Sequence, residues 1–372
     1  MLTDPKNIFY IISFVCRAMF DYNTLIGKIS TRRVQKTGGS SYVITLPKKW
    51  LESFIEDEEE IKGTALGMII QADNTLLVTP ELSKRRFSRK KVILIEQIED
   101  PNYFFRYLIS TYIAGFTEIE IQSKKTITQP FRAAIRHFIQ TVRYQEIIEE
   151  KDQYILIKDL FNPEEMPFHN IIDRMHMTAR NMHRDAIYAF KNNDRALLDT
   201  IAQRDNDVDR LYWLVARLTN MIMRDITLSE KIGITSGTAA NFFLIGRMIE
   251  RIADHAVRLS ENVELLIDQS INKNIVALIE KAVDIGLKVF QNSIEALFQH
   301  DIIKANANIE SAKPLDKICT EIMSYTFKQE SIMAIPLDNI VDSIRRLQQY
   351  SRDISENVMN YILVLEERPY YK

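Results

Sequence analysis

The feature that most constrains this chain is a helical pattern that runs from about residue 169 to the end of the sequence. Apolar residues recur there at spacings of three and four, which is typical of helices that bury one face. Helix-breaking residues fall only at joints, around Gly233 to Gly237, Asn272 to Asn274 and Pro336. We therefore expect more than half of the chain to form a helical bundle.

The helical region contains an internal repeat. Asp194 recurs as Asp301 after 107 positions, and Ser260–Val263 recurs as Ser355–Val358 after 95 positions. The difference between these offsets falls in the joint before the third helix of the first unit. The pattern predicts two tandem units of three helices each. Their expected bounds are 170–193, 195–224 and 237–269, followed by 275–299, 302–328 and 337–366.

Two acidic pairs lie in the first unit, Asp205 with Asp209 on its second helix and Glu250 with Asp254 on its third. Residues four apart share one helix face, so neighbouring helices would bring the four carboxylates together. A cation relieves the repulsion between them, and helical bundles hold metal ions in this way. We predict that these four residues bind a divalent or trivalent metal ion. Oxygen donors suit magnesium, calcium or manganese, and iron or zinc also binds carboxylates.

A plainer interpretation of the same acids remains open. An acidic pair on a helix often belongs to a solvated face, and Arg204, Arg210 and Arg251 are close enough in sequence to form salt bridges. His255 follows Asp254 directly, but adjacent residues point to different sides of a helix. His176 and His183 are interpreted as packing or surface residues, because no carboxylate spacing accompanies them.

The segment from Glu250 to His255, followed by Ser260-Glu261-Asn262, resembles the third-helix motif of PhoU domains, and Asp205 to Asp209 resembles the partner motif on their second helix. The resemblance implies tandem three-helix repeats, metal binding through the paired acids and a role in regulating phosphate uptake. In the second repeat only the acid Asp316 remains. Ala312, Arg345 and Gln349 stand at the other three positions, so the resemblance implies a metal site in the first repeat, and we expect Arg345 to form an internal ion pair.

The front of the chain has a β-like pattern. Ser41 to Leu46 alternates as a strand, Gly38-Gly39 permits a tight turn, a short helix is expected from Lys48 to Ile55, and Met68 to Val78 carries two further strands. The segment from Lys28 to Trp50 resembles the AbrB/SpoVT-type swapped-hairpin domain, which implies an intertwined homodimer that binds DNA. The predicted DNA contacts are basic side chains that suit phosphate groups: Arg32, Arg33, Lys36, Lys48 and Lys49. The alternative is a dimerisation domain without a DNA function.

Strands and helices alternate between residues 91 and 160, which predicts a small α/β module. Asp100-Pro101 begins one helix, Gly115 ends it, Val92 to Ile98 is an expected strand, and a polar turn links a hairpin near Glu146 and Tyr154. No glycine-rich phosphate loop is present in this module. The basic stretch 84–91 is interpreted as a solvated linker, and the acidic run 56–60 must point away from any DNA.

The fold class predicted is mainly α, with tandem PhoU-like bundle repeats preceded by a small β-rich AbrB-like domain and a small α/β module. The expected division is 1–26 leader, 27–82 β-rich domain, 91–160 α/β module, and repeats at 168–270 and 274–366. For the leader three interpretations remain: a packed or partly disordered segment, a native start at Met19, or an interfacial membrane anchor. Ile8 to Val15 is too short to span a bilayer, and no other segment is long enough. The two cysteines have no metal or disulfide spacing, which fits a reducing cytoplasm.

The combination of these parts resembles archaeal PhoU-type regulators. The leading hypothesis is a phosphate-responsive transcription regulator with a metal-binding sensory bundle. The alternative is a regulator that docks on the phosphate transporter's ATPase or on a sensor kinase without binding DNA. A metal-dependent enzyme is not favoured, because the Glu-x-x-His pair of di-iron bundles, a P-loop and a nucleophile elbow are all missing from the sequence.

Overall fold

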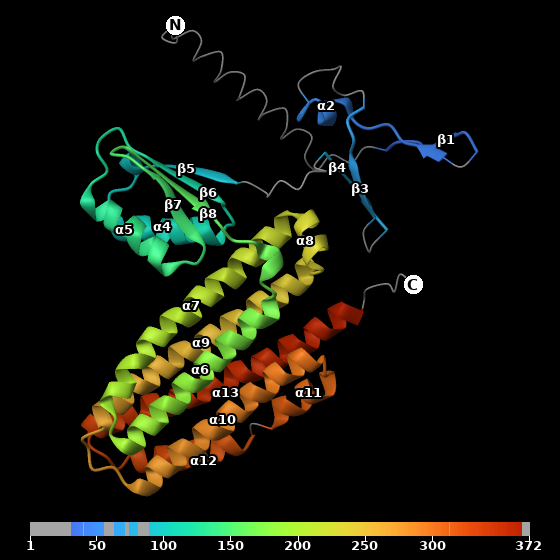
Figure 1. Ribbon diagram of the computed structural model, residues 1–372. Coiled ribbons are helices and arrows are strands. Elements are labelled where there is room, and N and C mark those ends of the chain that lie inside the picture. Colours follow the sequence, from blue (N-terminus) through green and yellow to red (C-terminus); the bar gives the residue numbers. More distant parts are fainter. Residues whose placement is uncertain are drawn as a thin grey trace. The chain divides into compact units, whose positions relative to one another are not determined.

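The computed structural model describes residues 31–39, 41–55, 63–70, 74–80, 89–311 and 313–366. The chain divides into two compact units, Met1–Arg85 and Arg86–Lys372. The predicted leader, the acidic run 56–60 and residues 84–88 of the basic stretch lie outside the described residues. Lys90 and Lys91 belong to the strand Lys90–Leu94, so the interpretation of the stretch as a solvated linker is wrong for these two residues. The predicted fold class is confirmed, since long helices make up most of the molecule and small sheets precede them (Figure 1). The five-part division of the chain stays a prediction.

The described residues of the first unit form two antiparallel hairpins and one short helix. Gly38 adopts a φ of 69°, so it permits the tight turn expected there. The elements are shorter than predicted, because each strand has one hydrogen-bonded neighbour and Ile55 is the only buried apolar residue described in this unit. The elements are β1 (Gln35–Thr37), β2 (Ser41–Val43), α2 (Lys48–Leu51), β3 (Gly67–Ile70) and β4 (Leu76–Thr79).

The second unit begins with a four-stranded sheet of order β5-β6-β8-β7, in which β5 and β6 are parallel. Two helices cover one face of this sheet (Figure 1), and their aromatic and aliphatic side chains form a core with the inward-facing isoleucines. The elements are β5 (Lys90–Leu94), η1 (Ile95–Gln97), α4 (Pro101–Ile113), β6 (Glu118–Gln122), α5 (Gln129–Thr141), β7 (Gln145–Glu150), β8 (Tyr154–Asp159) and η2 (Pro163–Glu165).

Local signals set most of these bounds. The Asp100 side chain accepts hydrogen bonds from the amides of Asn102 and Tyr103 and so caps α4, as predicted. The strand expected over residues 92–98 ends early, at Leu94. The reason lies in Glu96, whose carboxylate binds Ser123 and the Lys124 amide and draws the chain into a 3₁₀ turn.

Eight helices follow, and they share one continuous hydrophobic core. Helices α6 and α7 pack on α9, while α10, α11 and α12 pack on α13, and α9 lies against α13 (Figure 1). None of the helices in the described part of the chain is long and apolar enough to cross a membrane. The helices are α6 (Phe168–Asn192), α7 (Arg195–Arg224), α8 (Ile226–Ile232), α9 (Ser236–Leu266), α10 (Lys273–Gln299), α11 (Ile302–Glu310), α12 (Lys313–Thr326) and α13 (Ser331–Glu366).

The internal repeat is visible in the helix ends. Asn193 and His300, 107 positions apart, both adopt the left-handed conformation after their helices, with φ of 54° and 51°. Asp194 and Asp301 then cap α7 and α11 through the amide three residues on. Equivalent positions therefore end and begin equivalent helices, as the sequence repeat predicts.

The repeat is imperfect at three joints. The extra residues of the first unit form the short helix α8. The single helix expected over 302–328 is divided between α11 and α12, because Pro314 lacks an amide hydrogen and favours a new helix start. Pro336 was expected at a joint, yet α13 already begins at Ser331 and carries this proline within its first turns, where few amides need an intrahelical partner.

Arg217 of α7 ties the α/β module to the bundle. Its side chain is fully buried and donates hydrogen bonds to the carbonyl oxygens of Tyr112 in α4 and Phe116 just after α4, and to the carboxylate of Asp159 at the end of β8. Carbonyl groups at a helix C-terminus lack intrahelical donors, so a guanidinium is a suitable partner there. The two parts of this unit are thus joined by buried, charge-assisted hydrogen bonds.

Candidate functional site: a carboxylate cluster between two helices

The four predicted acids lie on facing turns of α7 and α9. Asp205, Asp209 and Asp254 are half-buried and Glu250 is buried, above the apolar contact made by Val208 and its neighbours. The spacing of four residues places each pair on one side of its helix, as predicted. The two helices pack against each other along this stretch. The structure therefore brings the four carboxylates into one cluster.

The electrostatics of this carboxylate cluster reflect burial and crowding. Burial, followed by the charges of Asp209, Asp254 and Glu250, raises the pKa of Asp205 to about 7. Burial and the charge of Asp254 raise the pKa of Glu250 to about 7 as well. The pKa of Asp209 is also raised, by burial and by Asp254. A cluster of this kind favours a bound proton or another cation near neutral pH.

Two arginines of α9 partly neutralise the cluster. Arg247 Nη1 lies 2.8 Å from Glu250 Oε1, and Arg251 Nη1 lies 3.1 Å from Asp254 Oδ2. The guanidinium of Arg247 also stacks 5.3 Å from the ring centre of Tyr212. The salt bridge expected for Arg251 is confirmed. Arg247 was not identified from the sequence, although its position three residues before Glu250 is the signal that could have revealed it.

The other two arginines considered from the sequence do not reach the cluster. Arg204 binds Asp185 of α6 at 2.6 Å, and Arg210 lies 3.4 Å from Asp207. The alternative interpretation, in which these two arginines form salt bridges with Asp205 and Asp209, is therefore wrong. The cause is geometric, since both arginines project toward a different side of α7 from the two acids.

These residues can bind a metal ion only if they offer carboxylate oxygens that have no other partner and if those oxygens point to one position. Asp205 Oδ1 and Glu250 Oε2 are buried without a hydrogen-bond partner, and all donors are hard carboxylate oxygens. As the side chains stand, however, no group of three or more His, Cys, Asp or Glu residues in the described ranges is arranged to hold an ion. Arg247 and Arg251 hold Glu250 and Asp254 in their present positions. The donor chemistry fits a hard cation, and binding would require these arginines to release the carboxylates.

The histidines of the first repeat face elsewhere. His183 Nε2 lies 2.9 Å from the carbonyl oxygen of Ile252, and burial lowers the pKa of His183 to about 4. The His176 ring packs 4.7 Å from the Phe290 ring. His255 is half-buried against α13. Of the two interpretations given for His176 and His183, packing or surface, the contacts and burial agree with packing.

The second repeat keeps part of the geometry without the acids. Arg346 Nη1 donates to Gln349 Oε1 at 3.0 Å, which repeats the contact between Arg251 and Asp254. The internal ion pair expected for Arg345 is not formed with any described residue, including Asp316, the remaining acid of the motif. Both side chains are exposed, so little is gained by holding them together.

The predicted DNA-contact residues are all exposed in the first unit. Arg32 and Arg33 precede β1, Lys36 lies within it opposite Tyr42, and Lys48 and Lys49 open α2. Lys48 Nζ lies 3.3 Å from a carboxylate oxygen of Glu52, so part of its charge is compensated.

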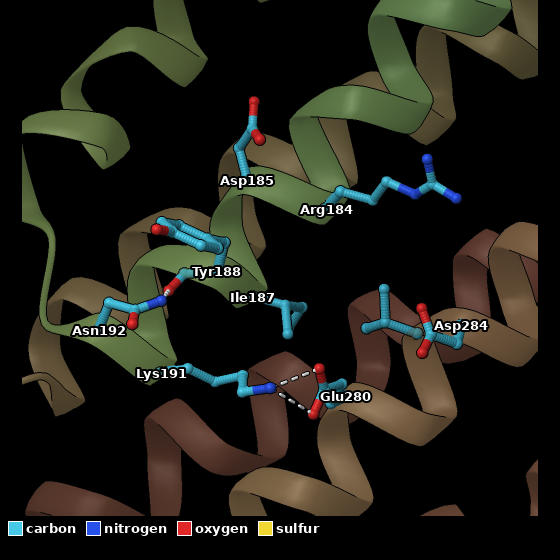
Figure 2. Close-up of a pocket in the computed structure, with 9 residues that line it drawn as sticks. Arg184, Asp185, Ile187, Tyr188, Lys191, Asn192, Glu280 and Asp284 are labelled. Carbon is cyan, nitrogen blue, oxygen red and sulfur yellow. Dashed lines mark hydrogen bonds and ion pairs between the residues drawn. The ribbon is translucent and has the colours of Figure 1, made fainter.

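A separate pocket of about 470 Å³ lies between α6 and α10 (Figure 2). Lys191 Nζ binds both carboxylate oxygens of Glu280 across it, at 2.7 and 2.9 Å. Arg184 is the second cation of the lining, against the three acids Asp185, Glu280 and Asp284. Because acids outnumber bases, this pocket does not favour an anion such as phosphate.

Comparison with known proteins bears on the first repeat. The family model described as PhoU domain matches residues 172–263, a stretch that contains all four clustered carboxylates. Two solved structures are similar to the chain: the phosphate transport system regulatory protein PhoU from Streptococcus pneumoniae and PhoU from Pseudomonas aeruginosa. The first has 11% identity and a TM-score of 0.45, and the match covers 52% of this chain and 92% of that chain. The second has 15% identity and a TM-score of 0.45, with 55% and 99% covered. No curated protein matches the sequence. The first helical repeat of this chain is thus similar to the PhoU domain.

Proposed function

We propose that this protein is a non-enzymatic regulator of phosphate transport that acts in the cytoplasm. The observation that carries the proposal is the match of residues 172–263 to the PhoU domain, together with the crowding of Asp205, Asp209, Glu250 and Asp254 inside that stretch. The test is uptake of labelled phosphate by cells with and without the gene. Uptake that no longer responds to external phosphate in the deleted strain is expected, and an unchanged response would reject the proposal.

The sensory element of this regulator is the carboxylate cluster. Asp205, Asp209, Glu250 and Asp254 would hold a divalent or trivalent ion, whose charge would replace that of Arg247 and Arg251 as the compensation for the acids. The raised pKa values of Asp205 and Glu250 support this role, because they show how unfavourable the uncompensated carboxylates are.

The first unit is proposed to dimerise and to bind DNA. Its strands expose Tyr42, Met68 and Ile70 at 70–72% while only Ile55 among its described apolar residues is buried, so a second copy would supply the missing core. The exposed cations Arg32, Arg33, Lys36, Lys48 and Lys49 would face phosphate groups.

Binding to DNA from upstream of the gene, measured at several salt concentrations, tests this part. Affinity that falls steeply with salt and exceeds that for unrelated DNA is expected. Equal affinity for both DNAs would leave the alternative, a regulator that docks on transporter or kinase components without reading DNA.

A further inference from the structure

Among the described residues of the second unit, helices pack on only one face of the sheet in the α/β module (Figure 1). Helices α4 and α5 pack on that face, over Ile119, Ile157 and the other inward side chains, and α7 approaches the module from that same helical side, where Arg217 binds the end of α4. Of these two helices, α4 contacts α7 of the bundle. On the opposite, outer face Val92 and Leu94 remain 44% and 41% exposed.

The outer face carries a row of four charged residues in strict register. Glu118 lies between Lys90 on β5 and Lys158 on β8, and Lys158 in turn lies opposite Glu146 on β7. Side chains at paired positions point to the same face of a sheet. From one edge to the other, the signs are therefore positive, negative, positive and negative.

Within one chain, only some of the charges in this row are paired with a neighbour in the row. Lys158 Nζ lies 3.3 Å from Glu118 Oε1 directly across the strands. Lys90 instead binds Glu120 in the next row. Glu146, at the far edge, is exposed and forms no ion pair with any residue that the structure describes.

The alternating row of four charges is related to itself by a two-fold rotation. The axis lies above the outer face, parallel to the strands and centred between β6 and β8. Rotation about it places β5 opposite β7 of the second copy and β6 opposite β8 of the second copy. Lys90 then faces Glu146 of the second copy, and Glu118 faces Lys158 of the second copy. All four facing pairs are opposite in sign, so this face is electrostatically complementary to itself.

The second row fits the same arrangement. Val92, Glu120, Leu156 and Glu149 lie side by side in register. Across the axis Glu120 faces Leu156 of the second copy and Glu149, which pairs with Lys151, faces Val92 of the second copy. Burying a carboxylate against leucine is costly unless its oxygens are bound. Glu120 already accepts hydrogen bonds from Tyr154 and Gln122 and pairs with Lys90, so its oxygens keep their partners.

We propose that this outer sheet face binds the same face of a second copy of the chain. Four strands spaced about 4.8 Å apart and five residues long cover roughly 300 Å² in projection, whereas a stable dimer buries about 800 Å² on each partner. The face is thus one of several contacts in a dimer. In this respect the inference rests on the proposed dimerisation of the first unit and adds a second interface to it.

Thiol cross-linking of the full chain tests the contact. Leu156 lies next to the axis, so Leu156→Cys in a Cys16→Ser background should give a covalent dimer with a short bismaleimide, while Cys319 is buried. Arg136→Cys in the same background is the control, because Arg136 is exposed on α5 at the covered side of the sheet. It should remain monomeric on a denaturing gel.

Charge exchange identifies the facing pair. Adding Glu146→Lys or Lys90→Glu to the Leu156→Cys protein should lower the cross-linked fraction at least fivefold, and the two together should restore it. Within one chain these residues lie on opposite edge strands, three spacings or about 14 Å apart. Rescue therefore reports contact between copies.

The outcomes also separate the two proposals. A dimer in sedimentation without a cross-link at Leu156→Cys overturns this inference and leaves dimerisation of the first unit standing. A cross-link that the single charge reversals do not weaken overturns the proposed register. A monomer in sedimentation with no cross-link overturns both.

Discussion

Arg217 and Asp159 form an ion pair whose side chains are 0% and 3% exposed, at the junction between the bundle and the α/β module. A buried charge that loses its partner is left without compensation, which costs far more than the loss of a surface contact. This junction is therefore expected to be the most sensitive polar contact in the second unit.

We predict that Arg217→Met lowers the free energy of unfolding by about 3 kcal/mol, because Asp159 and the carbonyl groups of Tyr112 and Phe116 lose the guanidinium group, while the Phe161 amide still donates to Asp159. Denaturant titration followed by circular dichroism measures this change. Arg195→Met is the matched control, since its pair with Asp268 is 50% and 77% exposed and should contribute less than about 1 kcal/mol. Equal effects of the two substitutions would contradict the assignment.

The pH dependence of stability should follow the carboxylate cluster. The pKa of Asp205 is raised to about 7 in the folded state, above its ordinary value of 3.8. Such a group stabilises the folded state fully below its unfolded pKa, and this contribution is lost as the pH rises through about 7. Metal-free protein should therefore melt at a higher temperature at pH 5 than at pH 8. Asp205→Asn should reduce the difference, and an unchanged difference would exclude Asp205 as its source.

Removal of two of the four acids should remove bound metal. Asp209→Ala combined with Asp254→Ala is expected to lower the metal content of purified protein severalfold while circular dichroism stays unchanged, because half of the oxygen donors are lost. Elemental analysis provides the measurement. Asp207→Ala with Glu261→Ala, on the same two helices, is the control and should retain the metal. The site assignment fails if both double variants carry the same amount.

Arginine release can be tested separately. Arg251→Gln should strengthen binding of Mn²⁺ by up to about fivefold, since a partly exposed ion pair to Asp254 contributes at most about 1 kcal/mol against the incoming cation. Arg258→Gln serves as control, because Arg258 binds Asp342 and Asn339 of α13 and not the carboxylate cluster. Calorimetric titration distinguishes the two, and weaker binding by Arg251→Gln would show that this arginine assists the metal.

Close packing of α10 on α13 predicts an unusual glycine requirement. A methyl group at Gly286 would lie 2.8 Å from Leu347 Cδ2 and 3.1 Å from its Cγ. Gly286→Ala should therefore destabilise the bundle by about 1–3 kcal/mol despite the higher helix propensity of alanine. Gly237→Ala, whose nearest neighbour would be 3.5 Å away, is the control. Stability that rises in both variants would mean that Leu347 moves aside at little cost.

The presence of each helix could be predicted because residues at its own start and along its apolar face determine it. Asp100, Asp194 and Asp301 each cap a helix start with the side-chain hydrogen bond that their residue type favours. The division between α11 and α12 was missed although Pro314 was visible, because strong apolar periodicity on both sides masked the break. Pro336 led to the opposite error, a joint predicted where the helix continues, because a proline can lie either before a helix or within its first turns.

The candidate site was predictable to the level of its acids and not beyond. Spacing alone places Asp205 with Asp209 and Glu250 with Asp254, and helix packing then brings the pairs together. Which arginine meets which acid depends on rotamers and on the rotation of α7 and α9 about their axes. For that reason the sequence left open salt bridges from Arg204 and Arg210 that the structure directs to other acids, and Arg247 was overlooked.

Helix α7 is unbroken between Asp209, in the carboxylate cluster, and Arg217, which binds the end of α4. Eight residues of helix span about 12 Å and behave as a stiff rod over that length. The two ends of this segment therefore move together. A displacement of α7 caused by a change of charge at Asp209 would be transmitted through Arg217 to the α/β module. The outer sheet face of that module is the face that we propose binds a second copy of the chain. Cation binding at the carboxylate cluster and the distance between two copies of the chain would then change together.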